Sequence, residues 1–310
     1  MTAPRGLRIG VDLGGTKIEA AAFDATGAER FRRRLATPRD DYEATVEAVA
    51  ALVEEAGRAA GGRGTVGVGT PGAISPASGL MKNANSVWLN GRPLHRDLEA
   101  RLGRRVRLAN DANCFALSEA VDGAAAGARV VFGVILGTGT GGGIVVDGRP
   151  LTGPGAVAGE WGHNPMPWPR GDEWPGPRCY CGRSGCIETF LSGPGMVRDH
   201  EERGGLAMAP AGIAREAAQG DPWARATLDR YAGRLARALA SVINILDPDV
   251  IVLGGGMSNI GALYDEVPRR WGDWVFTDRV TTPLRPPAHG DSGGVRGAAW
   301  LWSVEEAAAR

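Results

Sequence analysis

Lysine is almost absent from this chain of 310 residues, which has only Lys17 and Lys82 among its 35 basic side chains. Acidic side chains also number 35, so the chain lacks the basic excess typical of nucleic-acid-binding proteins. No apolar run approaches the roughly 18 residues that a membrane-spanning helix requires, and no apolar signal region follows Met1. We therefore expect a cytoplasmic protein that binds neither nucleic acid nor membrane.

Cysteine is also scarce, but three of the four cysteines lie close together in the sequence. In a cytoplasmic chain, such clustering indicates metal ligands before it indicates disulfides. One histidine upstream completes the four-ligand set of a closed, structural zinc site, with glycines between the cysteines to allow tight turns. The expected ligands are His163, Cys179, Cys181 and Cys186. The alternative is three reduced, buried cysteines beside an unrelated histidine.

Apolar runs that end in glycine alternate with segments of helical periodicity. Strands are expected at 8–13, 18–23, 30–35, 65–69, 106–109, 129–136, 144–146 and within 250–257, and helices at 41–60, 94–102, 113–126, 225–246 and 293–302. The proline- and tryptophan-rich segment 165–178 is expected to be irregular. Two regions, starting at residues 8 and 129, repeat the order strand, glycine turn with threonine, strand, Asp/Gly turn. This echo predicts a duplicated α/β fold with a cleft between two domains.

The first glycine turn has the sequence Asp12-Leu-Gly-Gly-Thr-Lys17. Glycines let backbone N–H groups face an anion without obstruction, Thr16 adds a hydroxyl donor and Lys17 adds a cation. Asp12 could hold a metal-bound water near phosphates. The spacing does not match a P-loop. The alternative is an ordinary glycine-rich hairpin.

The second glycine turn, 137–143, contains a G-x-G spacing that resembles part of a dinucleotide-binding fingerprint. That fingerprint requires a helix directly after it, whereas the apolar residues 144–146 and Asp147-Gly148 predict a strand and a hairpin. We therefore interpret the segment as a second phosphate-binding turn, which together with the first would hold one polyphosphate.

Acidic residues occur at two further places where chemistry is expected. Asp111 follows Asn110 at a predicted strand-to-helix junction, where it could cap the helix or take a proton from an attacking hydroxyl. Glu160 and Glu188 flank the cysteine cluster and could form charge-assisted hydrogen bonds to sugar hydroxyls. The alternative for these two glutamates is ordinary solvation at the surface.

Taken together, these motifs resemble the ROK family of sugar kinases and repressors over essentially the whole chain. The motifs are D-L-G-G-T-K at 12–17, G-T-P-G at 69–72, N-D-A-N at 110–113, G-T-G-x-G-G-G at 137–143, G-E-W-G-H at 159–163, C-x-C-G-x-x-G-C-I-E at 179–188 and G-G-G at 254–256. Residues 83–91, 163–168 and 288–302 look most like the bacterial fructokinase branch that also accepts mannose.

The resemblance implies an α/β fold similar to actin and hexokinase, that is, a ribonuclease H-like duplicated two-domain fold with ATP in the interdomain cleft. On this basis we expect an N-terminal domain of residues 1–118, joined by the C-terminal helix 293–310. The C-terminal domain would span 119–292 and carry the zinc-binding loop 159–188.

The resemblance also implies roles for individual residues. Asp111 would be the catalytic base. The sugar would contact Gly72, Asn85, Asn110, Asp111, Glu160, His163 and Glu188. The nucleotide would contact Asp12, Gly14, Gly15, Thr16, Lys17, Gly137, Thr138, Gly139, Gly254, Gly255 and Gly256. ATP, Mg²⁺ and a structural Zn²⁺ would be the cofactors.

We therefore expect an ATP-dependent fructokinase that makes fructose 6-phosphate, accepts mannose second and forms a homodimer. The alternatives within the family are an N-acetylglucosamine kinase and a glucokinase. A sugar-sensing repressor is disfavoured, because the first glycine turn begins at Gly14 and leaves no room for a preceding helix-turn-helix. We further expect metal loss to weaken sugar binding more than nucleotide binding, because the glycine turns lie elsewhere in the sequence.

Overall fold

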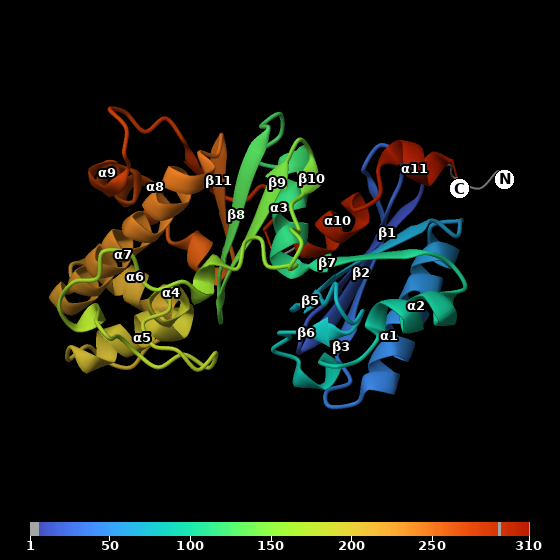
Figure 1. The fold of residues 1–310 in the computed structure, drawn as a ribbon, viewed down its shortest axis with the longest axis horizontal. Coiled ribbons are helices and arrows are strands. Elements are labelled where there is room, and N and C mark those ends of the chain that lie inside the picture. Colours follow the sequence, from blue (N-terminus) through green and yellow to red (C-terminus); the bar gives the residue numbers. More distant parts are fainter. Residues whose placement is uncertain (1–5, 291–292, 310) are drawn as a thin grey trace. The chain divides into compact units, whose positions relative to one another are not determined.

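The computed structural model of the protein describes residues 6–290 and 293–309, which fold into two compact units (Figure 1). The first unit contains the residues up to 122, residues 148–158 and the C-terminal residues from 293 onward. The second contains residues 123–147 and 159–290. Relative to the expected domains, residues 119–122 and 148–158 belong to the first unit. Residues 1–5, 291–292 and 310, at the ends of the expected ranges, lie outside the described residues.

The first unit begins with two glycine-linked strands and ends with the last helices of the chain. Its elements are β1 (Arg8–Leu13), β2 (Lys17–Phe23), β3 (Glu29–Ala36), α1 (Tyr42–Ala59), β4 (Thr65–Thr70), β5 (Ala73–Ile74), β6 (Met81–Lys82), η1 (Val87–Leu89), α2 (Leu94–Leu102), β7 (Val106–Asn110), α3 (Asp111–Asp122), β10 (Arg149–Pro150), α10 (Gly293–Trp300) and α11 (Val304–Ala308).

The sheet of the first unit has the strand order β3-β2-β1-β4-β7. The pairs β1/β2 and β2/β3 are antiparallel, whereas β1, β4 and β7 run parallel. Successive side chains of a strand point to opposite faces: Ile9 faces Gly57 of α1, and Gly10 faces α10. Helices therefore cover both faces, and the carboxyl ends of β1, β4 and β7 share one edge.

The second unit contains a sheet and most of the helices. Its elements are β8 (Val130–Leu136), β9 (Thr140–Val146), η2 (Trp161–His163), η3 (Gly171–Glu173), α4 (Ile187–Leu191), α5 (Gly193–Glu202), α6 (Pro210–Gln219), α7 (Pro222–Leu246), β11 (Val250–Gly254), η4 (Gly256–Asn259), α8 (Leu263–Glu266), α9 (Pro268–Trp271), η5 (Gly272–Trp274) and β12 (Leu284–Arg285).

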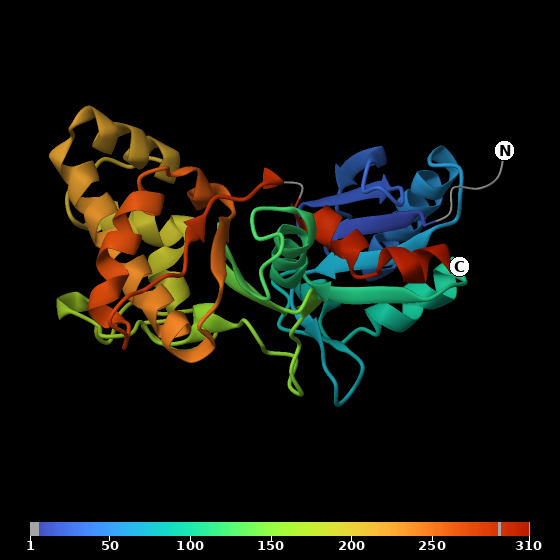
Figure 2. The same cartoon turned by 90° about the horizontal axis from the view of Figure 1, so that it is seen from above.

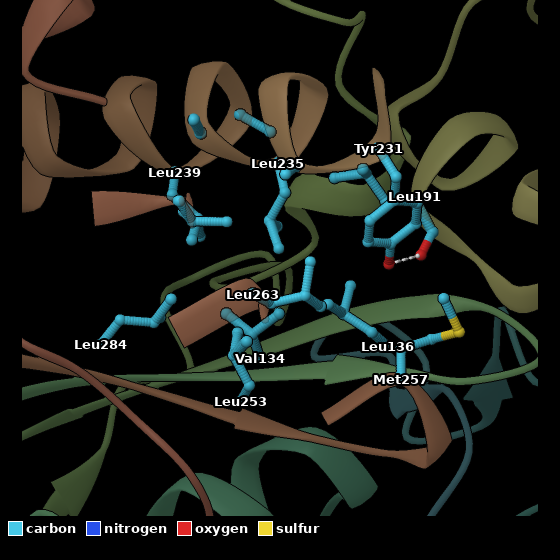
Figure 3. Packing of buried hydrophobic residues seen from close by; sticks show 14 of the residues in the cluster. Val134, Leu136, Leu191, Tyr231, Leu235, Leu239, Leu253, Met257, Leu263 and Leu284 are labelled. Atoms are coloured by element: carbon cyan, nitrogen blue, oxygen red, sulfur yellow. Dashed lines mark hydrogen bonds between the residues drawn. The ribbon is translucent and has the colours of Figure 1, made fainter. Parts of the chain in front are cut away.

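In the second unit, β9, β8, β11 and β12 are neighbours in that order, and the pairs β8/β11 and β11/β12 are parallel. The long helix α7 turns an apolar face towards this sheet. In Figure 3, Leu235 and Leu239 of α7 point towards Val134 and Leu253 of the strands. The hydroxyl of Tyr231 donates to the carbonyl of Leu191 at 2.7 Å, so α7 also holds α4 in place.

The described helices include none that is long and apolar enough to cross a membrane.

Two expected boundaries differ from the structure in a way that affects the site. Strand β9 begins at Thr140, so the second glycine turn is only Gly137–Gly139. Residues 141–143 are glycines inside a strand, where a side chain on Gly142 would collide with Trp161 at 2.7 Å. Helix α3 begins at Asp111 rather than at residue 113. Helices α4, α5, α6, α8 and α9 were not expected, and the expected C-terminal helix is divided into α10 and α11.

Candidate functional site

The carboxyl edge of the first sheet collects several expected site residues. Gly14 follows β1, Gly72 follows β4 after one intervening residue, and Asp111 follows β7. The side-chain amide of Asn110 donates to the carbonyl of Gly72 at 3.2 Å. Gly72 has φ +72°, and a side chain there would overlap the backbone of Lys82. Only glycine fits at this position, because the backbone of Lys82 lies so close. The hydrogen bond from Asn110 joins the same residue to the end of β7.

Asp111 is the first residue of α3 and is half-buried. Its Oδ1 accepts a hydrogen bond from the N–H of Ala112 at 2.8 Å, and Oδ1 of Asn110 accepts from the same N–H at 2.9 Å. Asn110, the residue before α3, therefore makes the capping contact to the second residue of the helix. The contact of Asp111 with the same N–H holds its carboxyl group at the sheet edge.

Asp12 lies near Asp111, and the pKa of its carboxyl is raised to about 7. Burial is the main cause, the negative charges of Asp111 and Glu19 add to it, and Lys17 and Arg34 oppose it. A bound cation would offset the repulsion between the carboxylates of Asp12 and Asp111. Carboxylate oxygens are ligands that magnesium accepts, so Asp12 could hold such an ion.

The first glycine turn is fixed by its backbone and by Thr37. The N–H of Gly14 donates to the carbonyl of Lys17 at 3.0 Å, which closes the turn. Thr37 bonds it twice, from its N–H to the carbonyl of Thr16 at 3.0 Å and from its hydroxyl to the carbonyl of Gly14 at 2.7 Å. Thr16 and Lys17 are exposed, as a role in phosphate binding requires.

The loop 83–91 carries the exposed Asn85 beside this turn. The side chain of Asn90 forms two hydrogen bonds with Ala84, both of 2.9 Å. Oδ1 of Asn90 accepts from the N–H of Ala84, and the amide group of Asn90 donates to the carbonyl of Ala84. A Cβ on Gly15 would lie 3.0 Å from the hydroxyl oxygen of the buried Ser86. The loop with Asn85 and the first glycine turn are therefore packed together.

In the second unit, two glycine segments follow neighbouring parallel strands. Gly137–Gly139 follows β8 and Gly254–Gly256 spans the end of β11. Gly255 has φ +76°, and a side chain there would overlap the backbone of Leu136. Ligands of α/β sheets bind at the carboxyl ends of parallel strands. Both glycine segments lie at such an end, where they could contact a bound ligand. Thr138 is exposed between the two glycines of its turn.

The four expected metal ligands lie together in the structure. Their donor atoms, from His163, Cys179, Cys181 and Cys186, are all within 4.8 Å of one another. A tetrahedral zinc places two sulfurs about 3.8 Å apart and a sulfur and a nitrogen about 3.5 Å apart. The distance from Cys181 Sγ to Cys186 Sγ is 3.6 Å, and that from Cys179 Sγ to His163 Nδ1 is also 3.6 Å. The donor set and its geometry fit this metal.

Tyr180 contributes to the cluster although the sequence analysis did not single it out. Its hydroxyl lies 3.0 Å from Nε2 of His163, the ring nitrogen opposite the one that faces the cysteines. Such partners of metal-bound histidines fix the orientation of the ring. The only signal in the sequence is the position of Tyr180 between two ligands.

The two glutamates beside the cluster differ in their contacts. Glu160 is exposed and directly precedes the short helix η2. Glu188 is half-buried, and its Oε2 accepts a hydrogen bond from the N–H of Thr140 at 3.0 Å. Glu188 therefore touches the second glycine turn, a contact that the sequence did not reveal.

The segment 165–178, which was expected to be irregular, contains the short helix η3. It is anchored by a buried glutamate that the sequence did not indicate. Glu173 accepts hydrogen bonds of 2.8 Å from Arg234 and Arg237 of α7. Burial opposes the charge of Glu173, but the two guanidinium groups hold its pKa below the ordinary value. This ion pair positions the loop between the metal ligands.

The comparisons with known proteins identify the family of the chain. The sequence matches the ROK family over residues 8–305. An N-acetyl-D-glucosamine kinase of Escherichia coli O6:H1 is 42% identical over 296 residues, which cover 94% of this chain and 98% of the relative.

Solved structures of ROK proteins also match along nearly the whole chain. The ROK hexokinase from Thermus thermophilus has a TM-score of 0.84 at 33% identity, and the match covers 96% of this chain and 98% of that one. A ROK family glucokinase from Streptomyces griseus, solved with glucose and AMPPNP, has a TM-score of 0.77 at 31% identity, covering 95% and 98%. These likenesses confirm the expected two-domain α/β fold of the actin and hexokinase type. By sequence and by structure, the chain belongs to the ROK family.

Proposed function

We propose that this protein is an ATP-dependent hexose kinase in which Asp111 is the general base. The observation that carries the proposal is the placement of Asp111 at the end of β7, held by the N–H of Ala112 and next to Asn110, which is tied to Gly72. A carboxylate fixed in this way can take the proton of a sugar hydroxyl as that hydroxyl attacks phosphorus. The high identity to a named sugar kinase supports the same reading.

The remaining residues would bind and orient the substrates, because phosphoryl transfer depends on positioning and charge neutralisation. The two glycine turns would hold the phosphates through backbone N–H groups, aided by Thr16, Lys17 and Thr138. Asn85, Asn110, Glu160, His163 and Glu188 would hold the sugar hydroxyls. A magnesium ion bound near Asp12 would supply positive charge next to the phosphates.

We propose N-acetyl-D-glucosamine as the preferred sugar. The support is the 42% identity to N-acetyl-D-glucosamine kinases from several Escherichia coli strains and from Shigella boydii. This support favours the alternative in the sequence analysis over its first expectation, fructose. Fructose stays the second candidate because of the Asn83–Gly91 loop, which resembles that of the fructokinase branch.

The test is a coupled ADP-release assay over a panel of N-acetylglucosamine, fructose, mannose, glucose and N-acetylmannosamine. We expect the highest kcat/KM for N-acetylglucosamine. A higher value for fructose would instead support the fructokinase assignment. Release of ADP that depends on none of these sugars would refute the hexose kinase proposal.

We also propose that the cluster of His163 and the three cysteines binds one zinc ion per chain. The fit of the two 3.6 Å donor distances to tetrahedral zinc supports this. Elemental analysis of the purified protein should find one equivalent of zinc, which Cys181→Ser should lower. Protein that contains no metal after expression with zinc in the medium would contradict it.

A further inference from the structure

The zinc-ligand segments and the second glycine turn are far apart in the sequence but lie in contact within the second unit. Glu188 comes two residues after the ligand Cys186 and accepts a hydrogen bond from the N–H of Thr140 at 3.0 Å. Gly139 is next to Thr140, and a Cβ on Gly139 would lie 2.6 Å from Oε2 of Glu188. The close approach of this carboxylate therefore requires a glycine at position 139.

The other end of the turn is held by the same segment of chain. After the short helix α4, the N–H of Gly193 donates to the carbonyl of Gly137 at 2.7 Å. The turn Gly137–Gly139 is thus bonded on both sides by residues that lie two and seven positions beyond Cys186. A shift of this segment would change the shape of the turn, and with it the direction of any backbone N–H group that would bind a phosphate.

The segment that carries His163, the remaining expected ligand, also contacts the start of β9. The indole N–H of Trp161, two residues before His163, donates to the carbonyl of Gly141 at 2.9 Å. A side chain on Gly162 would overlap the carbonyl of Thr140. Both segments that carry metal ligands therefore pack against the same few residues after the turn, and the metal would clamp one segment to the other.

Resting on the proposed function, we propose that Glu188 is a positioning residue that couples the metal cluster to the turn Gly137–Gly139 and so sets the affinity for the nucleotide. The expectation that metal loss weakens nucleotide binding less than sugar binding rested on the separation of the motifs in the sequence, and the Glu188–Thr140 hydrogen bond removes that premise. Glu188 would then serve both substrates, the sugar directly and ATP through the turn.

The chain offers a matched control in Glu160. Both glutamates flank the cluster and both are expected to contact the sugar, but only Glu188 touches the glycine turn. The experiment measures the binding of AMPPNP by calorimetry without sugar, and the hydrogen exchange of the Thr140 amide. Glu188→Ala should weaken AMPPNP binding about tenfold, the loss expected for a charge-assisted hydrogen bond that shapes the turn, and should speed exchange at Thr140.

Two further variants separate positioning from general loss of structure. Glu160→Ala should leave AMPPNP affinity and Thr140 exchange unchanged while it weakens sugar binding. Glu188→Gln keeps an oxygen acceptor and should restore most of the AMPPNP affinity. Unchanged AMPPNP affinity and unchanged Thr140 exchange in Glu188→Ala would overturn the proposal.

Removal of the metal tests the other half of the coupling. Dialysis against a chelator should weaken AMPPNP binding in the same direction as Glu188→Ala, and added zinc should restore it. The segments are also joined without metal, since the N–H of Ile187 donates to the carbonyl of Asn164 at 2.9 Å. Full AMPPNP affinity in folded, metal-free protein would refute the role of the cluster. If AMPPNP affinity depends on Glu188 but the protein phosphorylates no hexose, the proposed function is refuted and the role of Glu188 is not.

Discussion

Asp111 holds the N–H of Ala112 at the start of α3, and a single substitution tests whether it is also a base. In Asp111→Asn, an amide of nearly equal size can still accept from the N–H of Ala112. The amide cannot take a proton from a hydroxyl, so kcat should fall by about 10²–10⁴, the usual contribution of a general base. Steady-state kinetics with circular dichroism as a folding control checks this. Near-normal kcat with an unchanged pH profile would show that Asp111 is not the base and only contacts the start of the helix.

Asp12 makes the stability of the protein depend on pH in a direction that can be worked out. Its pKa is about 7 in the folded chain, mainly because of burial, and about 3.9 in an unfolded chain. At a pH between these two pKa values, the carboxyl of Asp12 has lost its proton in the unfolded state but keeps it in the folded state. The contribution of Asp12 to stability is therefore full below about pH 4 and is lost as the pH rises to about 7.

Asp12→Asn should remove this loss, because the amide stays neutral in both states. Without nucleotide or divalent metal, the variant should gain stability relative to the unmodified protein as the pH rises from 5 to 8. Urea unfolding at these two pH values measures the difference. An equal difference at both would show that Asp12 titrates normally.

At the scale of the element, the side chain of Asn90 helps to fix the shape of the loop 83–91. It forms two hydrogen bonds, both with Ala84, the residue before Asn85. Asn90→Ala should raise the KM for hexose about fivefold, which corresponds to the ~1 kcal/mol of a net hydrogen bond, with little change in the KM for ATP. Val87→Ala, which trims an exposed side chain of the same loop, is the control. A larger effect on ATP than on hexose would contradict the assignment of this loop to the sugar.

The elements show which parts of the structure the sequence could predict. The apolar runs placed β1, β4 and β8 within one or two residues, because buried strands have a strong local pattern. The start of β9 at Thr140 was missed, because a run of glycines ordinarily indicates a turn. Residues 141–143 are in a strand instead, and the packing of Trp161 against Gly142 cannot be read from the sequence. The short helices after Cys186 were missed because tertiary contacts, such as the bond from Tyr231 to Leu191, stabilise them.

The site divides in the same way. The grouping of His163 with the three cysteines was predictable, because thiolates and an imidazole at this spacing are typical of one metal site. The buried Glu173 and the contact of Glu188 with Thr140 were not, because each joins residues that are more than 40 positions apart. Sequence patterns report local geometry and leave such pairings open.

At the scale of the whole molecule, the end of the chain completes the unit that its beginning starts. Helix α10 packs on β1, β4 and α3 of the first unit, where Figure 2 shows it in red against the green helix α3. The indole N–H of Trp302 donates to the carbonyl of Val66 in β4 at 2.7 Å, and both groups are buried. The N-terminal sheet therefore reaches its final packing only when the last residues are in place.

Glycines make this close packing possible, and one of them gives a test with an unusual sign. Replacing a glycine inside a helix by alanine ordinarily stabilises a protein by about 0.5–1 kcal/mol. Gly297 lies inside α10, but a Cβ there would overlap the carbonyl oxygen of Cys114 in α3. Gly297→Ala should therefore lower the free energy of unfolding by about 1–3 kcal/mol, the usual cost of overpacking.

The long helix α7 supplies the matched control. Gly233 lies inside it, and the atom nearest to a Cβ there is Nη1 of Arg270 at 3.8 Å, an ordinary contact. Gly233→Ala should therefore raise stability, and Gly297→Ala should lower it, although the chemical change is the same. Thermal unfolding of both variants by calorimetry gives the comparison. A stabilising Gly297→Ala would mean that α10 does not pack on α3 this closely, and that the C-terminal segment is more loosely packed on the first unit.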